Sequence, residues 1–266
     1  MLVHVHSHRG SVPRVTDAWM AVFAQSCVGS IGGGHLEWQA TAHARWLLQS
    51  APKAPSLQRY ALGPTLGQCC GGEVVLRFER VTAEDVPRLQ LGFAQRQAAW
   101  PRVALFGGGH VARALVRVLG PLPVQVHWLD SRDEIFPPDL PENVYAEQAD
   151  PVHSAVVSLA ALSHVLIMSF SHAEDLDVLR ACLQRRRQQA DLPFIGLIGS
   201  QTKRARFFHR LQACGFTPEE LAQVTCPIGL PGITNKAPEV IAVAVAAQLL
   251  QVMEHGVSAT HLTKET

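Results

Sequence analysis

The sequence predicts an α/β protein in which a small N-terminal α+β domain precedes a Rossmann-like domain with a mostly parallel sheet. Beyond residue 100, short apolar runs alternate with amphipathic helical segments, a pattern typical of parallel strands covered by helices on both faces. Before residue 81, strand-like segments are separated by three glycine-rich turns. We therefore expect domains at residues 1–80 and 101–255, a linker at 81–100 and a polar tail at 256–266.

The N-terminal domain is predicted to contain four strands and one helix. The clearest strand alternates Val74, Leu76 and Phe78 with charged side chains, as expected when only one face of a sheet is buried. The helix is predicted from apolar residues that recur on one face from Leu36 onward. The predicted strands are 3–5, 19–23, 57–62 and 73–80, and the predicted helix is 36–49.

The Rossmann-like domain is predicted to contain five strands and five helices. The predicted strands are 103–106, 124–129, 143–146, 165–169 and 194–198. The predicted helices are 111–119, 152–160, 174–189, 202–214 and 238–252. Apolar strands that alternate with amphipathic helices indicate a parallel sheet covered on both faces.

Composition argues against several classes of protein. With 23 basic and 22 acidic residues, the chain has no excess positive charge to attract nucleic acid. The longest apolar run, residues 240–250, is shorter than the ~20 residues that span a membrane. Histidine and arginine interrupt the first ten residues, so we expect no export signal there. The six cysteines lack the spacing of a disulfide framework, which favours the reducing cytoplasm.

A glycine-rich turn after the strand 103–106 predicts a ligand site. Gly107, Gly108, Gly109 and His110 fit the pattern G-x-G-x-x-A, which leaves backbone N–H groups at a helix N-terminus free for a phosphate. Asp130 ends the next strand, where an acidic residue typically binds a ribose diol. The turn predicts a nucleotide-like or phosphate-bearing ligand. The alternative is a tight turn that packs strand on helix and binds nothing.

A second glycine turn predicts another anion site. Gly199 and Ser200 follow the strand 194–198, and Lys203, Arg204 and Arg206 lie in the first turn or two of the next helix. Cations are unfavourable at a helix N-terminus unless they share an anion with it. We therefore expect either a bound phosphate here or, equally, ordinary solvated basic side chains.

Four further side chains are candidates for ligand contacts. Cys69 and Cys70 are adjacent in a loop flanked by glycines, where thiolates can contact a soft metal or a sulfur centre. The alternative is two small buried residues. Cys226 lies in a loop after the last predicted strand and can face the same cleft. His172 follows the strand 165–169, at the edge where α/β sheets bind ligands.

Five segments of the sequence resemble motifs of the XdhC/CoxI family of xanthine dehydrogenase accessory proteins. They occur in the family's order and span nearly the whole chain. They are Arg9-Gly-Ser-Val-Pro-Arg14, Gly29-Ser-Ile-Gly-Gly-Gly-His-Leu-Glu37, Leu62-Gly-Pro-Thr-Leu-Gly-Gln-Cys-Cys-Gly-Gly72, Gly196-Leu-Ile-Gly-Ser200 with Lys203-Arg-Ala-Arg206, and Cys226-Pro-Ile-Gly-Leu230.

This resemblance implies an accessory factor rather than an enzyme. It implies a cytoplasmic homodimer that binds the molybdenum cofactor (molybdopterin), holds it for sulfuration by a cysteine desulfurase, and inserts it into the molybdenum subunit of xanthine dehydrogenase in purine catabolism. Cys69 and Cys70 would contact the molybdenum. The motifs and turns together assign the cofactor to Arg14, Gln68, Cys69, Cys70, Gly107, Gly108, Gly109, His110, Asp130, His172, Gly199, Ser200, Lys203, Arg204 and Cys226.

Two other functions remain open from the residues alone. An NAD(P)-dependent oxidoreductase would use the Gly107 turn and Asp130, with His110 or His172 as proton donor. A thiol-based redox or metal-binding protein would act through Cys69 and Cys70. Fold alone does not choose among these functions.

Overall fold

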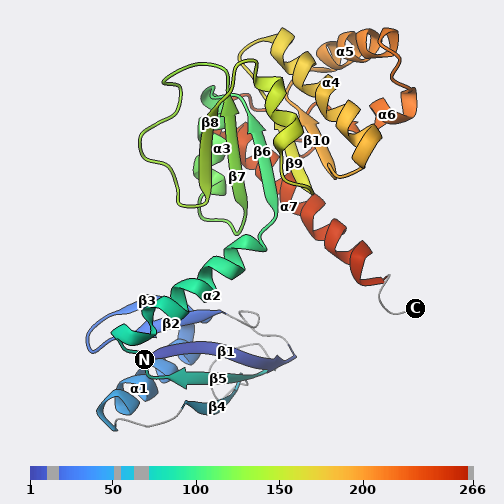
Figure 1. The fold of residues 1–266 in the computed structure, drawn as a ribbon. Helices are drawn as coiled ribbons and strands as arrows, with labels where there is room; N and C mark the ends of the chain where they lie inside the picture. The colour runs from blue at the N-terminus through green and yellow to red at the C-terminus, as the bar shows by residue number, and fades with distance from the viewer. Residues whose placement is uncertain (11–17, 51–54, 63–71, 263–266) are drawn as a thin grey trace. The chain divides into compact units, whose positions relative to one another are not determined.

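The protein, in a computed structural model, comprises two compact units. The structure describes residues 1–10, 18–50, 55–62 and 72–262, with side chains as far as Glu254. The first unit spans Met1–Phe93 and the second Ala94–Thr266 (Figure 1). Each unit has its own buried apolar core, and each is described by itself.

The first unit is a five-stranded antiparallel sheet with one helix against it. The strands lie in the order β3-β2-β1-β5-β4. Along β5, Val74, Leu76 and Phe78 point into the core and alternate with half-buried residues, as the sequence predicts. The elements are β1 (Leu2–Arg9), β2 (Trp19–Val22), β3 (Cys27–Gly29), α1 (Gly34–Ser50), β4 (Ser56–Ala61) and β5 (Glu73–Glu79).

The segment predicted as a linker is mostly helical. A short 3₁₀ helix, η2 (Ala83–Asp85), leads into α2 (Val86–Ala98), and the boundary between the two units lies inside α2. The Asp85 carboxylate accepts the Thr82 N–H at 2.9 Å and so satisfies a donor at the helix start. None of the residues of α2 is fully buried.

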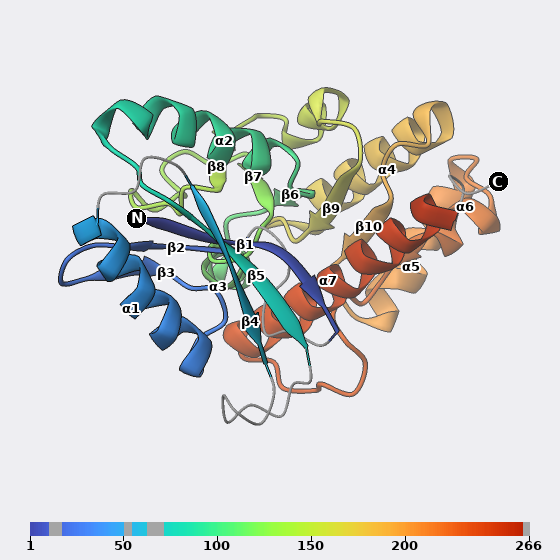
Figure 2. The same cartoon turned by 90° about the horizontal axis from the view of Figure 1, so that it is seen from below.

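The second unit is built on a six-stranded sheet whose neighbouring strands are all parallel (Figure 2). Its order is β11-β10-β9-β6-β7-β8. Counted along the chain within this unit, that order is 6-5-4-1-2-3, the order of dinucleotide-binding Rossmann folds. The strands are β6 (Arg102–Phe106), β7 (Gln125–Asp130), β8 (Val144–Gln148), β9 (Ser163–Ile167), β10 (Phe194–Leu197) and β11 (Val224–Thr225).

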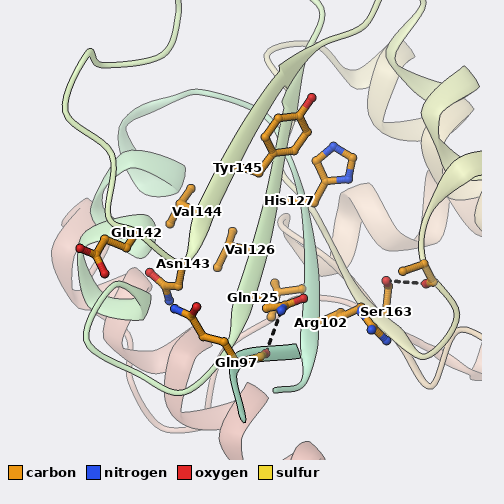
Figure 3. A pocket seen from close by; sticks show the side chains of 12 residues that line it. Gln97, Arg102, Gln125, Val126, His127, Glu142, Asn143, Val144, Tyr145 and Ser163 are labelled. Carbon is orange, nitrogen blue, oxygen red and sulfur yellow. Dashed lines mark hydrogen bonds between the residues drawn. The ribbon is translucent and has the colours of Figure 1, made fainter. Parts of the chain in front are cut away.

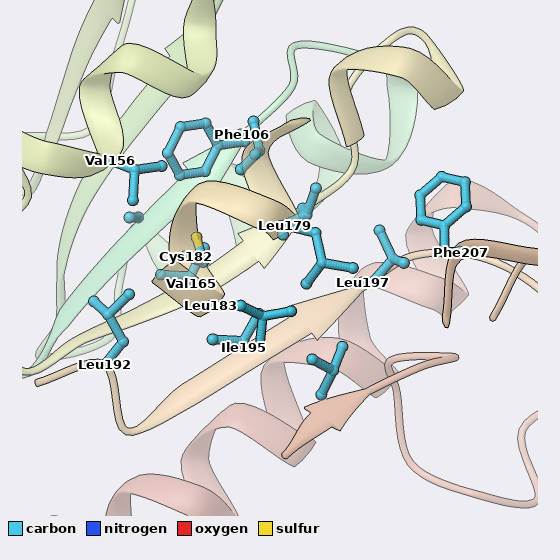
Figure 4. Close-up of a cluster of buried hydrophobic side chains, with 14 of the residues drawn as sticks. Phe106, Val156, Val165, Leu179, Cys182, Leu183, Leu192, Ile195, Leu197 and Phe207 are labelled. Atoms are coloured by element: carbon cyan, nitrogen blue, oxygen red, sulfur yellow. The ribbon is translucent and has the colours of Figure 1, made fainter. Parts of the chain in front are cut away.

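Helical segments pack on both faces of this sheet, as predicted. One core joins the sheet to α3 and α7, and the other joins it to η3, α4 and α5 (Figure 4). The two-sided burial explains why the central strands are apolar without alternation. The segments are α3 (His110–Leu119), η3 (Val152–Ser158), α4 (His172–Gln189), α5 (Gln201–Ala213), α6 (Pro218–Ala222) and α7 (Pro238–Leu262).

Several predicted elements differ from the structure. The α-helix predicted over 152–160 is the 3₁₀ helix η3, in which Val152, Ala155 and Val156 are buried; its β-branched and serine residues are weak helix formers. The short strands β3 and β11 were not predicted, because runs of two or three residues carry no periodic signal. The backbone of α7 stays helical to Leu262, beyond the predicted end at residue 252. Within the described residues, no helix combines the length and apolarity that crossing a bilayer requires.

Candidate functional site

The turn after β6 is packed tightly against the loop after β9. Gly107 has φ +115°, and a Cβ built there would lie 2.1 Å from the carbonyl oxygen of Met168. The Gly107 carbonyl accepts the indole N–H of the buried Trp128 at 2.7 Å. The backbone N–H of Gly107 donates to the Leu129 carbonyl at 2.7 Å. Glycine at 107 is therefore required by close backbone approach within the protein itself.

The Asp130 carboxylate is fully engaged by groups of the chain. One oxygen accepts the N–H of Gly108 at 2.5 Å and Nη2 of Arg132 at 2.8 Å, and the other accepts the backbone N–H of Arg132 at 2.9 Å and its Nε at 2.8 Å. These four donors fill the acceptor sites of a carboxylate. The free carboxylate that ribose binding requires is absent here, so this geometry does not favour the nicotinamide alternative.

The Asp130 interactions predict an acid-sensitive contribution to stability. Burial alone would raise the pKa of Asp130, but hydrogen bonds from Arg132 and Gly108 outweigh it and hold the pKa below its ordinary value of 3.8. A lowered folded-state pKa gives stability that is present above about pH 4 and is lost as the pH falls through the folded value. We expect Asp130→Asn to cost about 2 kcal/mol at pH 7, since solvent partly screens Arg132.

The measurement is urea unfolding of both proteins between pH 3 and pH 7. The difference in unfolding free energy between wild type and Asp130→Asn should begin to shrink below about pH 4, where the Asp130 carboxylate of the unfolded wild-type chain becomes protonated while that of the folded protein stays ionised. A difference that stays constant across this range would contradict the assigned role.

Side chains also bridge the crevice between β6 and β9, where the strand order reverses. The Arg132 guanidinium lies 4.9 Å from the centre of the Phe170 ring. The Ser131 hydroxyl donates to the Glu174 carboxylate at 2.6 Å, which links the loop after β7 to α4. Ligands of such folds usually bind at this crevice. In this chain its edge is occupied by the protein's own side chains.

In the first unit, the donor groups of the glycine turn before α1 are also bound by a carboxylate of the chain. Glu37, in the first turn of α1, accepts the N–H groups of Ile31 at 3.2 Å and Gly33 at 3.0 Å. It also accepts the hydroxyl of Ser30 at 2.7 Å. A carboxylate of the chain thus takes the place that an anionic ligand takes at other helix N-termini.

The lysine at the turn after β10 is bound by other groups of the protein. The Ser200 hydroxyl caps α5 by accepting the Lys203 N–H at 3.2 Å. The Lys203 ammonium turns back to the Asp175 carboxylate at 2.5 Å and to the Ile198 carbonyl at 2.8 Å. Both side chains are buried, with exposed fractions of 9% and 2%. Lys203, predicted to bind an anion, is therefore held by Asp175.

Cys226 lies at the same edge of the sheet, as predicted. It follows β11 and is buried. Burial raises the pKa of its thiol, although the positive charges of Lys203 and Arg204 lower it. The thiol is thus protonated at neutral pH in this conformation, and it is poorly suited to act as a thiolate ligand.

An open groove runs along α5 beside these groups. One cavity of 300 Å³ lies at the helix start, and one of 530 Å³ lies further along. The first contains three predicted residues besides Lys203, namely His172, Gly199 and Ser200. The two cavities share His172, Arg206 and Phe207, so they are neighbouring parts of one groove.

Sequence reasoning missed part of this groove. His209 and Arg210 line the second cavity beside the predicted Arg206, but they were not assigned to a site. The available signal was the position of Arg210, one helical turn after Arg206. Of the other predicted residues, Gly109 and His110 are exposed at the start of α3, while the Arg204 guanidinium lies 4.5 Å from the centre of the Phe208 ring.

A separate cavity of 370 Å³ lies near the opposite, amino-terminal edge of the sheet (Figure 3). Its polar lining includes Gln125, His127 and Tyr145, and the His127 imidazole lies 2.8 Å from the Glu147 carboxylate. None of the predicted site residues lines it. The predicted chemistry therefore gathers at the carboxyl edge and not here.

Four predicted residues lie outside the described part of the chain: Arg14, Gln68, Cys69 and Cys70. Their placement relative to the second unit stays a prediction. Within the described residues, no three His, Cys, Asp or Glu side chains gather closely enough to hold a metal ion.

Comparisons with protein families match both units. A family model described as the XdhC Rossmann domain matches residues 103–249. A second, described as the XdhC and CoxI family, matches residues 1–61. The two matches together cover most of the chain.

Two individual relatives show similarity along nearly the whole chain. The uncharacterized protein YqeB of Escherichia coli is 25% identical over 254 residues, which cover 94% of this chain and 43% of that protein. The chain thus spans less than half the length of this relative. A crystal structure described as a xanthine dehydrogenase from Bacillus halodurans has 19% identity and a TM-score of 0.77, covering 96% of this chain and 91% of that one. This likeness shows a shared fold.

Proposed function

Because the chain belongs to the XdhC and CoxI family, we propose that it is an accessory factor in the maturation of xanthine dehydrogenase or a related molybdenum enzyme. In this role it binds the molybdenum cofactor, holds it for sulfuration by a cysteine desulfurase, and transfers it to the molybdenum subunit. It acts as a carrier, in the form of a cytoplasmic homodimer, and the cofactor is its cargo.

The observation that carries this proposal is the groove along α5 at the carboxyl edge of the parallel sheet. This edge is where α/β folds bind ligands. The groove combines the start of α5, which bears a positive partial charge, with the exposed Arg206 and His172. These groups suit the phosphate of molybdopterin, and the aromatic ring of Phe207 offers an apolar wall.

The proposed division of labour follows from the chemistry of each residue. Arg206 and the Ser200 turn bind and orient the phosphate end of the cargo. The buried Asp175–Lys203 pair fixes the turn by holding the Ile198 carbonyl and the Ser169 N–H. Cys69 and Cys70 contact the metal–sulfur end, because thiolates are the protein ligands best suited to a soft metal centre.

The test is purification of the chain from a bacterial host that makes molybdopterin. Oxidised and denatured protein is expected to release a fluorescent pterin in amounts comparable to the protein. Addition of the loaded chain to a cofactor-free molybdenum hydroxylase is expected to raise its activity. A chain that carries no pterin and gives no activation would overturn the proposal.

The role of the cysteine pair has a matched control. We expect Cys69→Ser/Cys70→Ser to lower molybdenum content by tenfold or more, as is typical when ligands of a metal site are disturbed, about 10–100-fold. The control is Cys27→Ser/Cys214→Ser, which removes two exposed thiols. Equal molybdenum content in both variants would show that Cys69 and Cys70 do not hold the metal end.

A further inference from the structure

Helix α5 carries two arginines, Arg206 and Arg210, whose positive charges no described side chain neutralises. Its thirteen residues include Lys203, Arg204, Arg206 and Arg210, and none is acidic. Lys203 is paired with Asp175, but no described hydrogen bond or ion pair engages the side chain of Arg206 or Arg210. Like charges four residues apart on a helix repel each other. The guanidinium groups of Arg206 and Arg210 both line the groove and are therefore available to an external anion.

The geometry of the groove indicates more than one anionic group. Arg206 and Arg210 both line the 530 Å³ cavity, with His209 beside them and His172 at the start of α4. They lie one helical turn apart, about 6 Å along the axis, so that two guanidinium groups can converge on neighbouring phosphoryl groups. From Ser200 to Arg210 the groove extends about 15 Å along the helix, which suits an elongated ligand.

We propose that this groove binds a diphosphate ester, with Arg206 and Arg210 each engaging one phosphoryl group. The inference rests on the proposed function for the identity of the cargo. It then specifies that the cargo is carried in a diphosphate-linked nucleotide form rather than as the monophosphate. Recognition of a diphosphate itself depends only on the residues of the groove.

The first measurement is calorimetric titration of the full chain with inorganic pyrophosphate and with orthophosphate. Pyrophosphate is expected to bind at least tenfold more tightly, because it engages both guanidinium groups. Arg206→Gln and Arg210→Gln should each weaken pyrophosphate binding by about tenfold or more, the loss typical of one charged hydrogen-bonded contact. The control is Arg117→Gln, which removes an exposed charge from α3 and should leave binding unchanged.

Equal affinity for the two anions, or wild-type affinity in both groove variants, would overturn the proposal. A nucleoside diphosphate and the matching monophosphate then distinguish an ester from the free anion, and the diphosphate is expected to bind more tightly. Recovery of pterin without an equal amount of nucleotide would overturn the diphosphate form while leaving the carrier role standing. Pyrophosphate binding without any pterin in the purified chain would instead contradict the carrier role.

Discussion

Substitution of Gly107 by alanine is expected to destabilise the second unit by about 3 kcal/mol or more. The new methyl group would lie 2.1 Å from the Met168 carbonyl oxygen and 2.8 Å from the Ser169 nitrogen, and both are backbone atoms that cannot rotate away. Alanine also has to adopt φ +115°, which only glycine tolerates readily. Strain of this kind and overpacking each cost about 1–3 kcal/mol.

The matched control is Gly109→Ala in the same turn. No atom lies within 4 Å of a Cβ built at Gly109. We expect a loss of at most about 1 kcal/mol, because alanine is a poor residue at a helix N-cap. Thermal unfolding followed by circular dichroism measures both variants in the full chain. Equal melting temperatures for the two variants would show that the backbone at Gly107 and Met168 shifts easily, which would contradict the prediction.

The second large effect is expected at the Asp175–Lys203 ion pair. Asp175→Asn leaves the buried Lys203 ammonium without its counter-charge, and Lys203→Met leaves the carboxylate alone. Loss of one partner of a buried pair typically costs about 3–5 kcal/mol, because an uncompensated charge remains in the protein. Both side chains are buried, at 9% and 2% exposed, so solvent screens the charges little.

The double variant Asp175→Asn/Lys203→Met separates this pairing from loss of packing. It removes both charges, and we expect it to be less destabilised than the sum of the single variants by 2 kcal/mol or more, about the coupling of a close pair. Chemical unfolding of all four proteins provides this measurement. The control is Asp177→Asn, which breaks an exposed pair with Arg180 on the same helix and should cost about 0.5 kcal/mol or less. Strictly additive single effects would rule out the pairing.

Apolar periodicity was sufficient to predict most of the fold. Helices α4 and α5 and the central strands have long apolar patterns, and their predicted bounds agree with the structure to within about two residues at most ends. The 3₁₀ helix η3 was mistaken for an α-helix, because buried residues three and four positions apart fit either. The order of the strands follows from tertiary packing, which no single segment encodes.

The candidate site was less predictable than the fold. The sequence located both glycine turns correctly but not the partners of their charged residues. Asp130 satisfies Gly108 and Arg132, and Lys203 satisfies Asp175, whereas the sequence interpretation assigned Asp130 and Lys203 to an external ligand. Gly108 lies 22 residues from Asp130, and Asp175 lies 28 residues from Lys203, so a local pattern cannot distinguish these internal partners from a ligand. Only the structure shows that the Arg206 side chain has no carboxylate partner among the described residues.

The hydrogen bond between Trp128 and Gly107 lets the intrinsic fluorescence of Trp128 report on the second unit. Trp128 is fully buried, whereas Trp38 and Trp46 of the first unit are 67% and 58% exposed. Trp19 and Trp100 are half-buried. Because buried indoles emit at shorter wavelengths than hydrated ones, Trp128 contributes at the blue edge of the emission band. Because its N–H is bound to the carbonyl of the glycine turn, a shift in that band registers any rearrangement of the turn. Trp128 is thus an intrinsic fluorescent probe of the glycine turn at the carboxyl edge of the parallel sheet.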